Sequence, residues 1–459
     1  MNGGFARQQD RVMKPGPRSS PVIQGMLESA LRHHREGRLT EADQIYRQIL
    51  AVDARQADSL HLLGMIAYQA GRHEAAVELI RRAIAVNEKG TSYHSNLGTV
   101  LQAQGRLDQA AASYERALSL QPDLAEVHTN LGNVLQAQNK LDEALACHER
   151  ALALKPGLTE ARYNLGLAQL LKGDFTPGWH NFENRWQSKD FGTRMRAYPQ
   201  PLWTGQKLAS RRLLIWGEQG VGDEIMFAGL VPEVVRGGVR CILDCDRRLQ
   251  PLFARSFPDV EVVSSYSGQD FVAHLPCGSL PGILGTSRAA FAAYLSTDRE
   301  LQNGFRSRYA DGRMLVGLAW HTNARKTGRI RSIDLPCLAP LFALPGIRWV
   351  SLQYGDCDSL GNPILFDCSV NQLVDVDGFA AQVAAMDMVI TIDNSTAHMA
   401  GALGVPVWVL LPFAADWRWL RSGENSSWYP SMRLFRQPEC GDWASVVQRV
   451  SDELSQIRP

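Results

Sequence analysis

The chain has 459 residues, of which 45% are hydrophobic and 21% are charged, and its 48 Lys and Arg residues nearly balance 47 Asp and Glu residues. This length predicts about three domains, and the composition excludes a wholly disordered chain. The formal net charge of +1 argues against a general nucleic-acid-binding or membrane-surface protein, so we expect neither partner.

The N-terminus, the cysteines and the apolar runs predict a cytoplasmic protein. The eight cysteines contain no CxxC pair, which is typical of reduced thiols. Residues 1–20 carry charges, Pro and Gly without an apolar core, so we expect a flexible tail and no secretory signal. The longest uncharged run, Met399 to Ala415, is broken by Gly and Pro and is shorter than the roughly 20 residues of a membrane span. It predicts a buried helix followed by a buried strand.

The first part of the chain repeats with a period of 34 residues. Asn-Leu-Gly occurs at 96–98, 130–132 and 164–166, and each unit has a helix break near Gly37, Gly71, Gly105 or Asn139. A small residue recurs in the second half of each unit, at Ala42, Ala76, Ala110 and Ala144. Four positions after each of them is a larger residue: Tyr46, Ile80, Tyr114 and His148. The pattern resembles the tetratricopeptide repeat, a helix pair that buries its apolar face by stacking on its neighbours.

Three asparagines recur at the same position of the first helix of successive repeats: Asn96, Asn130 and Asn164. The first helices line the concave face of such a stack, and a side-chain amide can both donate and accept a hydrogen bond. We therefore expect a groove for an extended protein acceptor. The alternative is that Asn is simply usual at this position of the repeat.

From Arg211 short apolar runs alternate with helix-like segments, which predicts parallel sheets covered by helices. The expected strands are 213–216, 241–245, 260–263, 271–275, 314–320, 347–353, 388–393, 405–411 and 432–437. They fall into two series, so the predicted fold is a tetratricopeptide-repeat solenoid followed by two Rossmann-like lobes. The predicted parts are a tail (1–20), repeats (21–190), a linker (191–209), a first lobe (210–305) and a second lobe (312–459).

Three motifs follow predicted strands, where ligands bind in such folds. The glycine-rich turn Gly217–Glu224 places Asp223 at a helix start, where a plain helix-start charge is the alternative. The segment Thr391–Pro406 predicts a helix start at which the free N–H groups of Ser395, Thr396 and Ala397 bind phosphate, or else an ordinary helix cap. The loop Trp320–Ser332 carries Arg325, Lys326, Arg329 and Arg331. Such cations can stabilise a leaving diphosphate without a metal, although a solvated loop would look the same.

Longer motifs are similar to those of bacterial proteins that join tetratricopeptide repeats to a heptosyltransferase-like glycosyltransferase. They are GDFTPGWHNFENRW (173–186), GEQGVGDEIMF (217–227), the RS of RIRSIDL (329–335), VSLQYG (350–355), DMVITIDNSTAHMAGALGVPVWVLLPF (387–413), DWRW (416–419) and SSWYPSMRLFRQ (426–437). This resemblance implies a GT-B fold with the acceptor at the first lobe and a nucleotide-sugar at the second. The architecture is also similar to O-GlcNAc transferase. The resemblance implies that Asp223 is the base and that Asp393 and His398 lie at the donor. Asn394, Ser395 and His321 depart from the family pattern and leave the donor sugar open.

The leading hypothesis is therefore an inverting glycosyltransferase with a nucleoside-diphosphate sugar as donor and no required metal or cofactor. Glu218 and His321 are alternatives to Asp223 as the base. Residues expected at the donor are Arg325, Lys326, Arg329, Gln353, Asp393, Asn394, Ser395, Thr396, Ala397, His398, Pro412 and Phe413. Two alternatives remain, a repeat scaffold with a degenerate transferase region and a nucleotide-sugar epimerase.

Overall fold

The computed structural model describes residues 20–189, 191–209, 211–285, 292–324, 327–355 and 363–457. The chain divides into two compact units, Met1–Leu165 and Gly166–Pro459. Each unit is described by itself below. Among the described residues, no helix combines the length and the apolar character that crossing a bilayer requires.

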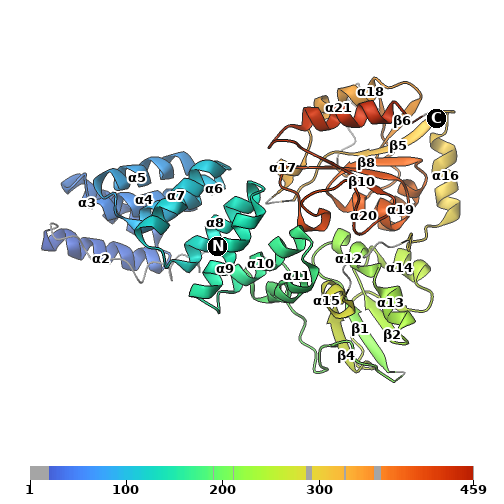
Figure 1. The fold of residues 1–459 in the computed structure, drawn as a ribbon, viewed down its shortest axis with the longest axis horizontal. Helices are drawn as coiled ribbons and strands as arrows, with labels where there is room; N and C mark the ends of the chain where they lie inside the picture. Colours follow the sequence, from blue (N-terminus) through green and yellow to red (C-terminus); the bar gives the residue numbers. More distant parts are fainter. Residues whose placement is uncertain are drawn as a thin grey trace. The chain divides into compact units, whose positions relative to one another are not determined.

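The first unit is built from antiparallel helix pairs, as the 34-residue period predicts (Figure 1). The two helices of a pair pack on each other, and α3, α5 and α7 each pack on the first helix of the next pair. The helices are α2 (Pro21–Arg35), α3 (Leu39–Val52), α4 (Ala57–Gln69), α5 (His73–Val86), α6 (Thr91–Ala103), α7 (Leu107–Leu120), α8 (Ala125–Ala137) and α9 (Leu141–Leu154). Helix α10 (Thr159–Lys172) begins in this unit and continues into the second.

In each of these four pairs, a residue with left-handed backbone follows the C-cap of the first helix. Gly37, Gly71 and Gly105 have φ of 76°, 74° and 74°, and Asn139 takes the same place with φ of 60°. Asn tolerates this conformation better than most other side chains. The backbone bond from the N–H of Lys140 to the carbonyl of Leu135 (2.8 Å) closes the same turn that Arg106 closes onto Leu101 (2.9 Å). The predicted helix breaks are confirmed.

Glycines inside the first helices allow the two helices of a pair to approach closely. A Cβ on Gly98 would lie 2.8 Å from the ring of Tyr114, and one on Gly132 would lie 2.6 Å from the ring of His148. Both rings are completely buried. The recurring glycine and the recurring large residue are therefore two halves of one contact, repeated along the unit.

The second unit contains two parallel sheets with helices on both sides (Figure 1). The first sheet has the order β3-β2-β1-β4. Its strands are β1 (Arg212–Trp216), β2 (Arg240–Asp244), β3 (Glu261–Val263) and β4 (Ala273–Pro276). Its helices are α12 (Val221–Ala228), α13 (Val231–Arg236), α14 (Gln250–Ser256) and α15 (Leu280–Leu284).

The second sheet has the order β10-β9-β8-β5-β6-β7. Its strands are β5 (Met314–Ala319), β6 (Ile347–Ser351), β7 (Ile364–Leu365), β8 (Met388–Ile392), β9 (Val407–Leu411) and β10 (Met432–Arg436). Its helices are α16 (Arg299–Tyr309), α17 (Gly328–Arg331), α18 (Ala339–Phe342), α19 (Val376–Ala384), α20 (Ser395–Ala402) and α21 (Trp443–Leu454). If β5 is numbered as strand 1 of this sheet and the sheet is read from β7 to β10, the order is 3-2-1-4-5-6. Doubly wound dinucleotide-binding sheets have the same order. The order reverses between β5 and β8.

The segment after α10 packs against both sheets of the second unit. Helix α11 (Phe175–Phe182) carries Trp179, whose ring centroid lies 6.5 Å from that of Phe227 on α12 and 5.3 Å from that of Trp417 after β9. Trp428 contacts the same group, 6.1 Å from Phe227. This aromatic cluster holds α11, the first lobe and the second lobe together. Residues 166–187 therefore belong to the core of the second unit.

Candidate functional site

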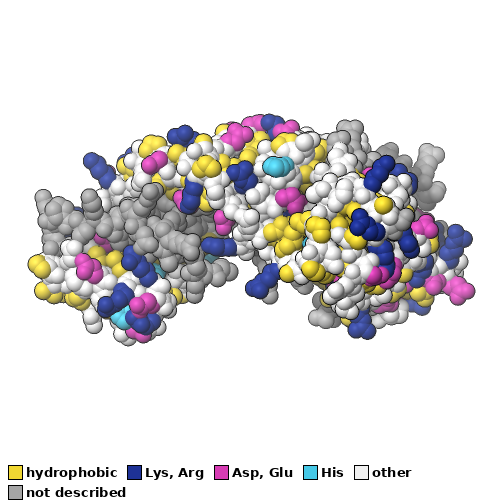
Figure 2. All heavy atoms as spheres, turned by 90° about the horizontal axis from the view of Figure 1, so that it is seen from below, with side chains coloured by type: hydrophobic (Ala, Val, Ile, Leu, Met, Phe, Trp, Pro, Cys, Tyr) yellow, Lys and Arg dark blue, Asp and Glu magenta, His cyan; other side chains and the backbone are white. Residues whose placement is uncertain are grey.

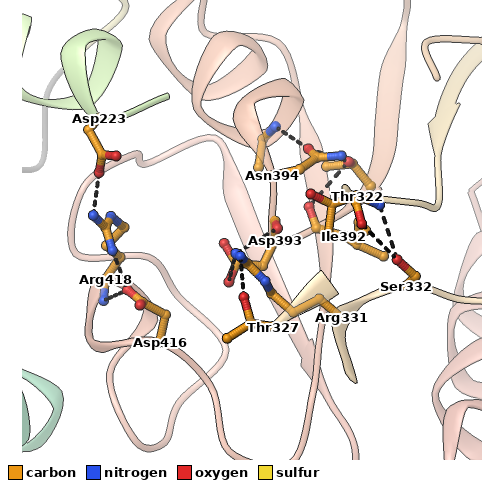
Figure 3. Close-up of polar contacts among 12 residues, drawn as sticks. Asp223, Thr322, Thr327, Arg331, Ser332, Ile392, Asp393, Asn394, Asp416 and Arg418 are labelled. Carbon is orange, nitrogen blue, oxygen red and sulfur yellow. Dashed lines mark hydrogen bonds and ion pairs between the residues drawn. The ribbon is translucent and has the colours of Figure 1, made fainter. Parts of the chain in front are cut away.

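The reversal point of the second sheet brings together side chains from two segments, the end of β8 and the α17 segment (Figure 3). Asp393 directly follows β8 and is buried. Arg331, at the end of α17, donates through Nη1 to the Asp393 carboxylate (3.0 Å) and backbone carbonyl (3.2 Å), and through Nη2 to Thr327 (2.5 Å). Burial raises the pKa of Asp393, and the Arg331 charge opposes that rise. Ligands of doubly wound sheets bind at this kind of crevice.

Asn394 caps the helix that starts next to this crevice. Its Oδ1 accepts the N–H groups of Thr396 (3.0 Å) and Ala397 (3.3 Å). The prediction that these two N–H groups are free for phosphate is therefore wrong, because the side chain of the preceding asparagine already occupies them. The Nδ2 of Asn394 is buried and has no hydrogen-bond partner among the described residues, and the same holds for Nε of Arg331. A buried donor left without an acceptor costs about 1–3 kcal/mol, so two of them at one crevice fit a ligand that supplies acceptors.

His398 lies one turn into α20 and is fully buried. Its Nδ1 is 3.1 Å from the Tyr429 hydroxyl, and its ring stacks on Trp419 with centroids 5.2 Å apart. Burial lowers the pKa of His398 to about 3, and the charges of Arg418 and Arg331 add to that effect. The imidazole is therefore neutral at physiological pH, and two arginines lie within electrostatic range of this helix start.

Asp223 of the first lobe meets Arg418 of the second (Figure 3). Arg418 lies in the short helix η5 (Trp417–Trp419); its Nη2 pairs with Asp223 and its Nη1 with Asp416 (2.6 Å). Its guanidinium also stacks over Trp417, 4.4 Å from the ring centroid. The side chains of Asp223 and Arg418 are only 19% and 13% exposed. The ion pair thus joins the two lobes where the predicted base lies.

The backbone on both sides of this ion pair is tightly constrained. A Cβ on Gly222 would lie 3.3 Å from His398 and 3.4 Å from Ser395, so the first turn of α12 packs directly on the first turn of α20. Leu420, which follows η5, has φ of 58° and ψ of 169°, a conformation almost restricted to glycine. Such a conformation costs about 1–3 kcal/mol and occurs most often at functional sites.

Glu218, considered above as an alternative base, is held by an arginine. Both carboxylate oxygens accept from Arg185, through Nε and Nη2, at 3.1 Å each. Both side chains are completely buried. Burial raises the pKa of Glu218 and the Arg185 charge opposes that rise. With both oxygens occupied, Glu218 is poorly placed to accept an acceptor proton.

Of the other residues expected at the donor, Gln353, Pro412 and Phe413 follow strands of the second sheet. The Oε1 of Gln353, after β6, accepts the backbone N–H groups of Trp320 (3.0 Å) and His321 (2.8 Å), so it holds the backbone after β5. The His321 ring is exposed and 3.0 Å from Asn323 Oδ1. Pro412 and Phe413 follow β9, and Phe413 donates its N–H to Gln437 (3.1 Å). Arg329 is exposed, and Arg325 and Lys326 lie outside the described residues.

The asparagines predicted for an acceptor groove are all half-buried on first helices of the repeats. Two of them already bond within the first unit: Asn96 Nδ2 lies 2.7 Å from His61 Nε2, and Asn164 donates to Asn133 (2.8 Å). Asn130 makes no hydrogen bond to the described residues through its side chain. Asn130 is therefore the member of the series whose amide is free for a partner.

Two charged residues of the site had not been assigned a role from the sequence. Arg331 lies in the basic loop and in the RS of the RIRSIDL motif, and Arg418 lies in the DWRW motif, but neither is among the residues expected at the donor or as the base. The signal that they share is position, because Arg331 lies in the segment after β5 and Arg418 lies in the segment after β9. Elsewhere on the second unit, Lys and Arg side chains are interspersed with Asp and Glu on the face drawn in Figure 2.

A separate cavity of about 550 Å³ lies in the second unit and shares no lining residue with the crevice just described. It lies between α11, the extended segment around Trp203 and α15. Trp179, Trp203 and Ile283 give it an apolar wall, and Glu183 provides a carboxylate. It leaves room for a side chain of a bound molecule.

Comparison with known proteins supports the repeat assignment. Two tetratricopeptide-repeat family profiles match, at residues 27–91 and 90–157. Protein FlbA of Caulobacter vibrioides is 32% identical over 325 residues, 62% of this chain, and the chain spans about half (53%) of that relative's length. Among solved structures, MamA is 22% identical with a TM-score of 0.32, over 34% of this chain and 91% of MamA. YrrB, described as a TPR protein with an unusual peptide-binding site, is 21% identical with a TM-score of 0.31, over 35% of this chain and 82% of YrrB. Residues 27–157 are tetratricopeptide repeats.

Proposed function

We propose that the protein is an inverting glycosyltransferase with a GT-B pair of lobes, which transfers a sugar from a nucleoside-diphosphate donor to a protein held by its repeats. One observation carries the proposal. Asn394 Nδ2 and Arg331 Nε are buried donors without partners in the described part of the chain, and both lie at the reversal point of a doubly wound sheet. Phosphate and sugar oxygens are acceptors that would satisfy them.

The geometry supports a single-displacement reaction. The acceptor hydroxyl oxygen attacks the anomeric carbon of the sugar, its proton passes to the Asp223 carboxylate, and the bond from that carbon to the diphosphate oxygen breaks with inversion. The nucleoside diphosphate leaves with the electron pair. Arg331 and the Nδ2 of Asn394 stabilise the charge that develops on it. Asp223 comes from the first lobe and Arg331 from the second, so the proposed reaction occurs where the lobes meet.

The repeats favour a protein as the acceptor. Tetratricopeptide repeats present a continuous surface whose use is the binding of other proteins. Asn130 offers a free amide there, and such an amide can bond the backbone of an extended segment without reading its sequence.

Donor binding tests the proposal directly. The full chain is titrated by calorimetry with UDP, GDP, CDP, ADP and dTDP, with their sugar conjugates and with the parent nucleosides. We expect at least one diphosphate to bind and its nucleoside to bind much more weakly. Asn394→Asp keeps the oxygen that caps α20 but removes the unpartnered donor, so it should weaken the diphosphate at least about tenfold. Arg331→Met removes the other unpartnered donor and a positive charge, so it should also weaken the diphosphate. Arg313→Met is its matched control and should leave binding unchanged, because Arg313 pairs with Asp311 just before β5, at the other end of that strand.

A repeat scaffold with an inactive α/β unit is the second candidate. One observation favours it: Asp223 and Asp393 are each neutralised by an arginine, so the site is electrostatically satisfied without a substrate. Failure of every nucleotide to bind, together with capture of a partner by the repeats, would establish the scaffold. Donor turnover in the absence of any acceptor would instead indicate an epimerase.

A further inference from the structure

We propose that Asp223 is an internal counter-anion of the donor site, which a diphosphate displaces from Arg418 so that the carboxylate is released only when the donor is bound. The inference rests on the proposed function and adds an order of events to it. Its starting point is the ion pair between Arg418 and Asp223, which joins the two lobes.

The surroundings of this ion pair favour anions. The first turns of α12 and α20 pack on each other at Gly222, so two helix N-termini, each with a partial positive charge, lie together. Arg418 and Arg331 add two full charges, and both act on His398 at the start of α20. The unpartnered Nδ2 of Asn394 lies in the same turn.

The aspartates around this point neutralise those charges in the structure. Asp393 pairs with Arg331 at 3.0 Å, and Asp416 pairs with Arg418 at 2.6 Å. Asp416 belongs to the loop that carries Arg418, two residues away, and moves with it. Asp223 lies on α12 and is not part of that loop, so its side chain can separate from Arg418 while Asp416 stays paired.

A bound diphosphate and Asp223 would compete for the same guanidinium. A phosphate offers Arg418 two acceptor oxygens and more negative charge than a carboxylate does. Once displaced, Asp223 no longer shares its charge with an arginine and can accept the proton of an acceptor hydroxyl. The donor must then bind before the acceptor can react, which limits proton transfer in the absence of the sugar.

Inorganic pyrophosphate is the probe for this competition, measured by calorimetry on the full chain at fixed ionic strength. Asp223→Asn should bind pyrophosphate about three- to tenfold more tightly than the parent, because its amide competes weakly for Arg418. Arg418→Gln should bind it more weakly. The double variant should match Arg418→Gln, since no guanidinium is left to compete for. Glu224→Gln is the control, because Glu224 lies on the same turn of α12 but accepts from the backbone of Asp246 (2.8 Å).

Two results would overturn the inference. One is an Asp223→Asn variant that binds pyrophosphate no more tightly than the parent does. The other is a double variant that keeps the full gain of Asp223→Asn, which would make the gain a general charge effect. Either result leaves nucleoside-diphosphate binding untouched, so the inference can fail while the proposed function stands. The proposed function can also fail while the competition at Arg418 is real. That result would be a chain that binds pyrophosphate through Arg418 but binds no nucleoside diphosphate.

Discussion

Arg185 and Glu218 form a two-point ion pair that is completely buried, with both nitrogen–oxygen distances at 3.1 Å. Arg185 belongs to the short helix η2 (Glu183–Gln187) after α11, and Glu218 to the glycine-rich loop after β1. The guanidinium also lies 4.4 Å from the ring centroid of Trp186. Two motifs that are separate in the sequence thus form one structural element.

Replacement of Arg185 by Met should destabilise the second unit by about 3–5 kcal/mol, because it leaves the Glu218 carboxylate buried without its partner. The measurement is urea unfolding followed by tryptophan fluorescence. The double variant Arg185→Met with Glu218→Gln should recover part of that loss. Equal losses for the single and double variants would contradict the pairing.

Gly98→Ala should destabilise the repeats by about 1–3 kcal/mol, because the added methyl would meet the buried Tyr114 ring at 2.8 Å. Gly25→Ala in α2 is the matched control. Gly25 is exposed and nothing lies near its added Cβ, so this change should stabilise by about 0.5–1 kcal/mol. Far-UV circular dichroism with urea measures both, and a shift of the same sign for both variants would argue against the close helix contact.

His148 should make the repeats sensitive to acid. Burial lowers the pKa of His148 to about 4, below its ordinary value of 6.5. Between these two pH values His148 is protonated in the unfolded chain and neutral in the folded chain. The contribution of His148 to the free energy of unfolding is therefore fully present above about pH 6.5. It falls by about 1.4 kcal/mol per pH unit between about pH 6.5 and pH 4.

His148→Tyr places the residue found at Tyr46 and Tyr114 in the same repeat position, and the ring no longer gains a proton. The variant should lose less stability than the parent between pH 7 and pH 5, measured by urea unfolding at both values. Parallel losses in the two proteins would mean that His148 contributes nothing to the pH dependence.

Asp223→Asn should lower transfer by about 10²–10⁴-fold, the usual loss when a general base is removed. The assay follows the nucleoside diphosphate released by the full chain in the presence of the acceptor, once the binding screen has named a donor. Glu224→Gln should keep most of the parent rate. Transfer at the parent rate by Asp223→Asn would reduce this residue to a helix-start charge.

The repeats and most strands could be predicted because their signals are local and periodic. A period of 34 residues locates each helix pair, and Asn139 is recognisable as the equivalent of three glycines. Long apolar runs locate strands such as β8 and β9. Strand β7 is not predicted, because its two residues are too few to show an apolar run or an alternating pattern.

The charge pairs of the site could not be predicted, because each joins residues that are distant in the chain. Arg418 and Asp223 are 195 positions apart, and Arg331 and Asp393 are 62 apart. Sequence order places each residue after a strand but does not say which of several acidic groups an arginine will reach. For the same reason Glu218 looks like a free acid in the sequence and is the partner of Arg185 in the structure.

Helix α10 crosses the division between Leu165 and Gly166, and the residues after it complete the α/β core. The repeats therefore cannot be separated from the α/β unit at the predicted junction near residue 190. An excision there would remove Trp179 and Arg185 and leave the glycine-rich loop with an unneutralised charge. A gene rearrangement that replaced the repeats while keeping the α/β unit intact would have to break the chain between α9 and α10, around residues 155–158.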